Sequence, residues 1–442
     1  MKLFTRKVLT VALASTFAIS LTACGGTTNT DGKDSAKTQS EPAKETVKKE
    51  PVTVSYLAVT SQLNYGGIKD LIAAWEKKTG NKVDIQAIQD DQYDNLVKAK
   101  LAGGGDLDIF FGAYQKYDVA NQLLQISGEG FESRLNDVAL QSMKYTDGKI
   151  YAFPAPMGLA TWGAFYNKQV FKDLGLSVPK TMDDFNKDLA AIKAKGITPL
   201  YFSAKDGWTM LQHRNAVNGI VGGTDSSIWD KLNKNQIQWK DVPAFVDQYK
   251  QVEDWVKQGY INKDLTATYD QQQQALVDGK AAIVIQGSFI DSELMKKKAD
   301  AQIGFFPLPN KDGSEKLALG GATQVFIAKN SKHAEAAKDL LRYLSDKEQV
   351  KSYLEKSPGI SPFKDVDVSD KLSPAFKEIQ AVVSAGNIAR HGDDAYVVPL
   401  PYDELVAAYT ELLAGRITAD QFVQKHGDMY VKNAKIAKIP GF

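Results

Sequence analysis

The chain has 442 residues, and its 54 Lys and Arg nearly balance its 53 Asp and Glu, for a formal charge of +1. This balance lacks the basic surplus of a nucleic-acid-binding protein, so we expect no nucleic-acid partner. A single cysteine, Cys24, excludes an internal disulfide framework.

The first 23 residues have the layout of a secretory signal. Three basic residues lie in the first seven positions, and residues 8–23 form an uncharged, largely apolar run that ends in small side chains. A bilayer span needs about 20 mostly apolar residues, which this run does not reach. "LTAC" resembles the lipobox of bacterial lipoproteins. We therefore predict a lipoprotein signal peptide over 1–23 and acylation of Cys24, for example by palmitate; the alternative is an ordinary signal peptide with an incidental cysteine.

Residues 24–51 are predicted to form a disordered tether. After Cys24 this segment holds one Val, two Ala and no aromatic residue, too little apolar surface to offset the entropy of ordering. As a flexible coil it would span roughly 25–30 Å. No second apolar stretch approaches membrane-spanning length, so we expect the lipid alone to attach the protein to the membrane. Removal of the signal peptide would change the formal charge from +1 to −2.

The body, about 390 residues long, exceeds what one hydrophobic core usually serves, which predicts two domains. Apolar spacing and glycine positions predict its first elements. They are a strand at 52–57, a helix at 68–80, a strand at 82–88, a helix at 93–105 and a strand at 107–113. This β-α-β-α-β order predicts an α/β fold with a parallel sheet.

A second α/β region follows, and helices dominate the C-terminal part. The predicted elements are strands at 163–168, 198–204, 280–289, 301–309 and 322–330, and helices at 182–196 and 333–356. This order predicts a doubly wound architecture in which the chain returns to its first domain late.

The loops that follow the first strands, where open α/β sheets bind ligands, carry polar and aromatic residues rather than a phosphate-binding glycine pattern. HExxH, GxSxG, GxxxxGK[ST] and cysteine pairs are absent from the sequence, so no such motif indicates a metal, a cofactor or a catalytic nucleophile–base pair. We expect no cofactor, no metal and no enzyme activity. Two acidic motifs have metal-site alternatives. "RHGDDAY" (390–396) is better explained as a polar loop, and "DDQYD" (90–94) as an N-cap cluster.

Several aromatic residues lie in or beside predicted turns, unlike Trp75 and Trp255, which are expected to pack on helix faces. Such side chains can stack on the apolar faces of sugar rings, at about 0.5–1.5 kcal/mol per contact beyond burial. They are Trp162, Trp208, Phe289, Tyr396 and Tyr402.

Motifs along the whole body follow one another in a specific order. They are "IAAWEKKTGNKVDIQ" (72–86), "LAGGGDLDIFFGA" (101–113), and the segments 148–176, 196–209, 271–290, 304–309, 320–344 and 412–422. In this order they resemble the extracellular solute-binding proteins of ABC importers, in the maltose-binding-protein-like, carbohydrate-binding cluster.

The resemblance implies a two-lobed, type II periplasmic-binding-protein-like fold. Each lobe would be a mainly parallel sheet flanked by helices, and the lobes would close over ligand. Three crossings are expected near 157–162, 311–319 and 357–364. Lobe 1 would comprise 52–158 plus 319–360, and lobe 2 would comprise 161–312 plus 364–442.

The resemblance also implies ligand-binding positions. Gly112 stands where related maltose binders have Trp, which argues against malto-oligosaccharide, and Phe289 keeps an aromatic face where the family usually has Trp. The expected positions are Gln62, Asn64, Asp91, Tyr114, Gln115, Trp162, Asp206, Trp208, Phe289, Gly320, Gly321, Arg390, Tyr396 and Tyr402.

The function implied is that of a monomeric, lipid-anchored receptor outside the cytoplasm. It would capture a carbohydrate, an oligosaccharide, and deliver it to the permease subunits of an ABC transporter. Two alternatives stay open from the residues: a receptor for another polar solute such as a glycerophospho-compound, and a tethered glycoside hydrolase. The hydrolase would use a carboxylate pair drawn from Asp90/Asp91, Asp206 or Asp393/Asp394. A surface adhesin would show repeats or a long stalk, which the sequence lacks.

Overall fold

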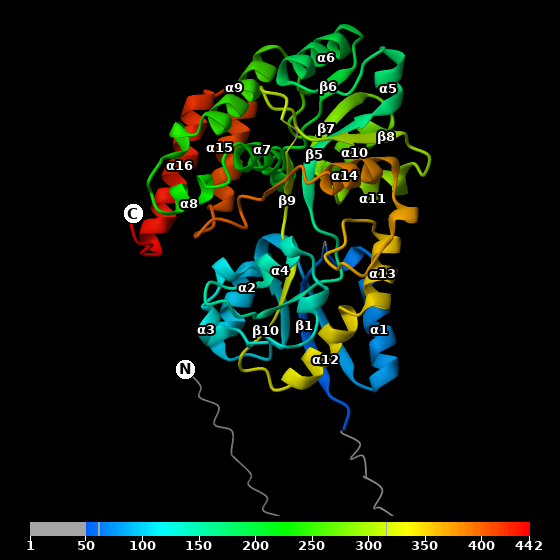
Figure 1. Ribbon diagram of the computed structural model, residues 1–442, viewed down its shortest axis with the longest axis vertical. Coiled ribbons are helices and arrows are strands. Elements are labelled where there is room, and N and C mark those ends of the chain that lie inside the picture. The colour runs from blue at the N-terminus through cyan, green and yellow to red at the C-terminus, as the bar shows by residue number, and fades with distance from the viewer. Residues whose placement is uncertain (1–49, 61, 315) are drawn as a thin grey trace, which may run out of the picture. The chain divides into compact units, whose positions relative to one another are not determined.

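The computed structural model describes residues 50–442, apart from Ser61, Glu315 and the side chains of Asn64, Asp90 and Asp91. The predicted signal peptide, Cys24 and almost all of the predicted tether lie outside the described residues. Within them the main strands form two sheets, one of five strands and one of six (Figure 1).

The first sheet begins with the predicted β-α-β-α-β unit. Its strand order is β2 (Lys82–Ile88), β1 (Thr53–Val59), β3 (Ile109–Gly112), β10 (Gln324–Ile327) and β4 (Ala152–Pro154). β1 is parallel to β2 and β3, and the connecting helices are α1 (Ile68–Thr79) and α2 (Asp90–Gly103). β10 then pairs antiparallel with both β3 and β4.

The second sheet is built around the fully buried strand β5 (Thr161–Asn167). The order is β11 (Ile388–Arg390), β9 (Leu317–Leu319), β5, β7 (Ala281–Gly287) and β6 (Thr198–Leu200), with β8 (Ile303–Phe306) also paired to β5. β5 is antiparallel to β7, β8 and β9. The α/β class is confirmed, but the prediction of mainly parallel sheets is wrong. Two consecutive strands of one sheet can pair in parallel only when a long crossover connects them. β5 and β10 have no such crossover, because each follows directly on a strand of the other sheet.

The chain changes sheets at three places. It leaves the first sheet after Pro154 and enters the second at Thr161, and it returns between Leu319 and Gln324. The second crossing was expected at 311–319, but β9 occupies the end of that range and is paired with β5 and β11. The third change follows α12 (Ala334–Leu344) and α13 (Lys347–Lys356) and leads to α14 (Pro374–Ser384), which packs on β8.

Helices cover both faces of the second sheet. α14 and α10 (Tyr269–Val277) pack on one face, and α7 (Leu211–Thr224) lies against β5, β7 and β9. α9 (Pro243–Lys257), α15 (Tyr402–Leu413) and α16 (Ala419–Ile436) gather around α7 (Figure 1). The other helices are α3 (Val119–Gln122), α4 (Asp137–Met143), α5 (Lys168–Asp173), α6 (Met182–Ala194), α8 (Ile228–Asn233) and α11 (Ile290–Lys297).

Amphipathic spacing explains most helices, but not α7. In α12, Ala337, Leu340, Leu341 and Leu344 recur at helical spacing and are all buried against α1 and β10. α7 is buried almost all round although it carries polar and charged side chains. Buried polar groups need partners, so α7 is a place to look for function. Across the described part of the chain, no helix is long and apolar enough to cross a membrane.

Candidate functional site

Two connected cavities lie where the chain passes between the sheets. The first, here called the main chamber, has a volume of about 460 Å³. The second, the side chamber, has a volume of about 310 Å³. Both are lined by Trp208, Gln212 and Asn215, so they form one cleft.

Residues from both sheets line the main chamber. Gln62, Tyr65, Thr323 and Tyr353 come from segments that pack with the first sheet, and Trp162, Ser288 and Phe289 come from the second. Among its described lining residues, none carries a charge. The lining therefore combines aromatic faces with neutral amide and hydroxyl groups.

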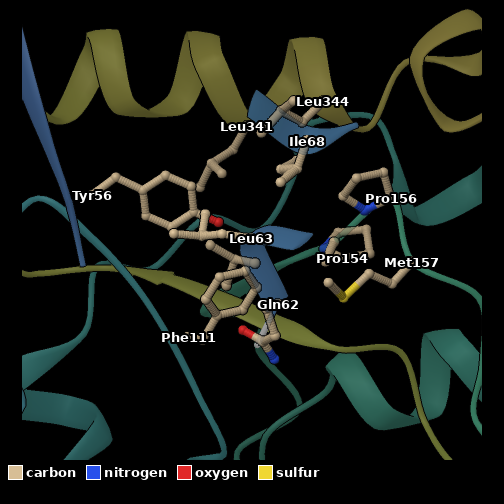
Figure 2. A pocket seen from close by; sticks show the side chains of 12 residues that line it. Tyr56, Gln62, Leu63, Ile68, Phe111, Pro154, Pro156, Met157, Leu341 and Leu344 are labelled. Atoms are coloured by element: carbon tan, nitrogen blue, oxygen red, sulfur yellow. The ribbon is translucent and has the colours of Figure 1, made fainter. Parts of the chain in front are cut away.

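A third, largely apolar cavity adjoins the main chamber inside the first sheet's core, and Gln62 and Met157 line both (Figure 2). Its volume is about 10 Å³, which is room for roughly one water molecule. It is a packing gap rather than a second ligand site.

Trp162 is held at the start of β5 by contacts on several sides. Its indole Nε1 donates to Oε1 of Gln212 at 2.7 Å, and the Gln212 amide nitrogen donates to the Trp208 carbonyl at 2.8 Å. The Trp162 ring also stacks on the His391 ring, with centroids 4.2 Å apart and planes inclined by 22°. One amide thus links the two tryptophans that line the main chamber.

Trp208 lies on a 3₁₀ turn, Gly207–Thr209, at the front of α7. Its ring meets Tyr269 edge to face at 4.8 Å and Phe289 at 5.8 Å. Oδ2 of Asp206 accepts the backbone N–H of Tyr269 at 2.7 Å and so ties the turn to α10. Asp206, predicted to bind ligand, thus bonds to the backbone of α10 and does not line either chamber.

Seven of the positions expected from the sequence meet in the cleft. Trp162, Gln62 and Phe289 line the main chamber, Gln115, Tyr396 and Tyr402 line the side chamber, and Trp208 lines both. The side chains of Asn64 and Asp91 lie outside the described part of the structure.

Tyr114 was predicted to bind ligand, but it does not line the cleft. Its ring is buried, its hydroxyl donates to the Met143 carbonyl at 2.6 Å, and it accepts the Tyr151 N–H at 3.1 Å. The backbone after β3 turns this side chain inward, so Tyr114 packs in the first sheet's core instead of lining the cleft.

Gly320, Gly321 and Arg390 lie beside the cleft rather than in it. A Cβ on Gly320 would lie 3.0 Å from Cη2 of Trp162, so this glycine lets the indole edge approach the backbone. Gly321 and Arg390 line a separate cavity of about 240 Å³, together with Asp394. The structure does not bring these three predicted residues to the two chambers.

Packing against Tyr117 explains why position 112 is a glycine. A Cβ there would lie 2.4 Å from the Tyr117 ring, so any larger side chain would displace that tyrosine. An aromatic side chain at this position has no room unless Tyr117 moves.

An ion pair between the buried Arg214 and the partly exposed Asp393 supports the side chamber. Arg214 Nη2 and Nη1 contact the two carboxylate oxygens of Asp393 at 2.7 and 3.0 Å, and only 3% of the Arg214 side chain is exposed. Desolvation raises the pKa of the Asp393 carboxyl, but attraction by Arg214 outweighs it and lowers that pKa to about 2. Asp393 therefore stays a carboxylate at neutral pH and is unsuited to the proton-donating role of a glycosidase acid.

Sequence reasoning missed several lining residues. Gln212 and Asn215 follow Trp208 at intervals of four and three residues, which is the spacing of one helix face. This helical spacing after Trp208 could have identified both residues from the sequence. The sequence around Tyr65 and Tyr353 does not mark them as lining residues, because it does not distinguish them from aromatic residues that pack in the core. Within the described residues, no group of three or more His, Cys, Asp or Glu side chains could hold a metal ion.

Comparison with known proteins agrees with the two-sheet fold. The family model described as bacterial extracellular solute-binding protein matches residues 60–351. The chain belongs to this family. Since its members are extracellular, membership implies a location outside the cytoplasm.

The relatives and solved structures are similar over nearly their full lengths. The melibiose/raffinose/stachyose-binding protein MelE of Bacillus subtilis is 23% identical, with 90% of this chain and 92% of MelE covered. The diacetylchitobiose binding protein DasA of Streptomyces coelicolor is 27% identical, with 89% of each covered.

Among solved structures, a chitin oligosaccharide binding protein has a TM-score of 0.73 at 25% identity, covering 87% of this chain and 100% of its own. RafE in complex with raffinose has a TM-score of 0.71 at 18% identity, covering 86% and 98%. The fold is thus the two-lobed fold of solute-binding proteins, and the relatives are named as binding proteins rather than enzymes.

Proposed function

We propose that this solute-binding protein is the receptor of an ABC importer, and that it captures a neutral oligosaccharide in the cleft and delivers it to the permease. The observation that carries the proposal is the lining of the main chamber, in which Trp162, Trp208 and Phe289 adjoin the amides of Gln62, Gln212 and Asn215 without any charge. Aromatic rings pack against the apolar C–H faces of sugars, and amides bond to hydroxyls. The sugars named for MelE, DasA and RafE are of this chemical class.

Binding would work by closure of the two lobes. The main chamber takes Tyr65 and Tyr353 from one side and Trp208 and Phe289 from the other, so one sugar can contact both lobes at once. Lys296 of α11 already lies 5.6 Å from the centre of the Tyr65 ring. A ligand favours the closed form only through contacts that the open form lacks, and these paired walls supply them. No chemical step is involved.

A charged ligand is less well supported. A glycerophospho-compound needs a cation at its phosphate, but the cations that line the side chamber are already paired. Arg214 binds Asp393, and Lys116 lies 2.6 Å from Asp94. A glycosidase is also less well supported, because Asp393 is held by Arg214 and Asp206 is bonded to the backbone of Tyr269.

The N-terminal segment supports a further part of the proposal. Acylation of Cys24 would anchor the receptor to the outer face of the cell membrane, and the tether would leave the monomeric body free to reach the permease. The support is the position of Cys24, the chain's single cysteine, directly after the apolar run.

The test is binding without turnover. Residues 24–442 carrying Cys24→Ser would be titrated calorimetrically with raffinose, stachyose, diacetylchitobiose, maltotriose and glycerophosphocholine, and the mixtures would be analysed for cleavage products. We expect at least one of the first three sugars to bind intact and maltotriose to bind more weakly. Binding of glycerophosphocholine alone would overturn the choice of sugar. Cleavage of a bound sugar would overturn the receptor itself.

A further inference from the structure

His391 belongs to the "RHGDDAY" motif, and it covers one face of Trp162. The two rings are stacked at 4.2 Å, and 5% of His391 and 8% of Trp162 is exposed. The small exposed part of the indole lines the main chamber. His391 does not line either chamber, so it touches the cleft only through the tryptophan.

The rest of the indole is fixed as well. Gln212 accepts its N–H at 2.7 Å, and Gly320 lies so close to its benzo edge that a Cβ would come within 3.0 Å of Cη2. With the nitrogen and one edge held, the stacked imidazole is the contact that opposes tilting of the ring. A side chain that is already ordered loses less entropy when ligand binds.

His391 is itself held in place. Its Nε2 lies 3.4 Å from the Asn218 amide nitrogen, and Nε2 accepts from this amide when the ring proton is on Nδ1. Burial lowers the pKa of His391, so the ring is neutral near pH 7. A Cβ on Gly392 would lie 2.9 Å from Asn218, so glycine is required for this approach.

The loop that carries His391 is anchored to two elements outside it. Asp393 binds Arg214 of α7, and Asp394 Oδ2 accepts the N–H of Gly321, in the segment that joins the sheets, at 2.7 Å. The loop has few ways to move, which makes it a rigid support for an aromatic platform.

We propose that His391 is a positioning residue of the ligand site: its imidazole supports the Trp162 indole from behind, so that a sugar ring meets a preset surface. The inference rests on the proposed function for its ligand, but the support of the indole can be measured without ligand.

The test uses two variants that separate stacking from hydrogen bonding. His391→Phe keeps the aromatic face and loses the ring nitrogens, whereas His391→Gln keeps an acceptor for Asn218 and loses the face. The indole N–H resonance of Trp162, assigned by its absence in Trp162→Phe, would be followed by ¹H–¹⁵N NMR for position, line width and exchange with water. His391→Leu is a second ring-less variant, in case the glutamine variant does not fold.

We expect the Trp162 resonance to broaden and exchange faster in the ring-less variants and to stay sharp in His391→Phe. With stachyose as probe, the ring-less variants should bind about two- to tenfold more weakly, the equivalent of one lost aromatic contact. His391→Phe should recover most of that affinity. Val397→Ala is the matched control, because Val397 is an exposed side chain just after the "RHGDDAY" motif. It should leave both the Trp162 resonance and the affinity for stachyose unchanged.

An unchanged Trp162 resonance in the ring-less variants would overturn the proposal, as would a phenylalanine variant that behaves like them. If the wild-type protein binds none of raffinose, stachyose and diacetylchitobiose, that result counts against the proposed function, and the ligand-free resonance still decides the role of His391.

Discussion

Gly321 donates its backbone N–H to a carboxylate oxygen of Asp394 at 2.7 Å, which ties the second inter-sheet segment to the loop behind Trp162. The same segment is fixed from the other side, where Ser142 Oγ of α4 accepts the N–H of Ala322 at 3.0 Å. These two bonds connect a helix of the first lobe, an inter-sheet segment and a loop of the second lobe.

Asp394→Ala should therefore destabilise the fold. A hydrogen bond to a charged group contributes about 1.5–3 kcal/mol. We expect a smaller loss, about 1–2 kcal/mol in the free energy of unfolding, because Asp394 is partly exposed to solvent. Urea denaturation checks this value. Asp300→Ala, an exposed carboxylate, is the control, and equal losses in the two variants would contradict a specific role for the Gly321 bond.

Trp208→Ala should weaken oligosaccharide binding by at least about tenfold, since central aromatic residues carry much of the free energy of binding. Trp208 lines both chambers and packs on Tyr269 and Phe289. Calorimetric titration of the sugar identified by the panel measures the change. Tyr343→Ala, which removes an aromatic ring outside the cleft, should bind like wild type; unchanged affinity in Trp208→Ala would show that the cleft is wrongly assigned.

Gly287→Ala should displace Phe289. A Cβ on Gly287 would lie 2.2 Å from Cε1 of that ring, so the phenyl group has to move away from its place against Trp208. We expect a several-fold loss of sugar affinity, which titration would detect. Gly103→Ala is the matched control, because a Cβ there meets nothing within 4 Å. Full affinity in Gly287→Ala would mean that Phe289 is not part of the binding wall.

Asp291 should make stability depend on pH. It is 2% exposed with Ser373 Oγ as a partner at 2.8 Å, and burial raises the pKa of its carboxyl to about 6. A folded-state pKa above the unfolded value of about 3.9 means that the protein loses stability as the pH rises from about 4 through 6, because ionisation then favours the unfolded chain.

Asp291→Asn removes this titration and retains an acceptor for Ser373. The variant should be more stable than wild type at pH 7.5, by up to about 2 kcal/mol, and the difference should shrink at pH 4.5. Thermal unfolding at the two pH values is the measurement, and a difference that does not change with pH would contradict the assignment.

Cys24→Ser should release the protein from the membrane fraction and leave sugar binding intact, because the change removes the acylated side chain and no residue of the cleft. Fractionation of cells followed by immunoblotting measures the distribution. Continued membrane association of the serine variant would refute the anchor.

The cleft residues that could be predicted from the sequence share a local signal. Trp162, Trp208 and Phe289 lie at strand ends or turns, where a large aromatic side chain is not needed for a helix or strand face, and all three line the main chamber. Tyr114 has the same local signal and packs in the core, because the direction of its side chain depends on how the backbone turns after β3. Local sequence does not encode that direction.

By itself, the sequence determined the α/β class, the parallel β-α-β-α-β unit that opens the first lobe, and most of the aromatic walls of the cleft. These follow from apolar periodicity and from turn residues, which are properties of short segments. The tertiary structure alone decided the antiparallel pairings of β5 and β10, the place of the second crossing, and the contacts of Trp162 with Gln212 and His391. His391 lies 229 positions after Trp162 in the numbering, and such a pair meets only when separate segments pack against one another.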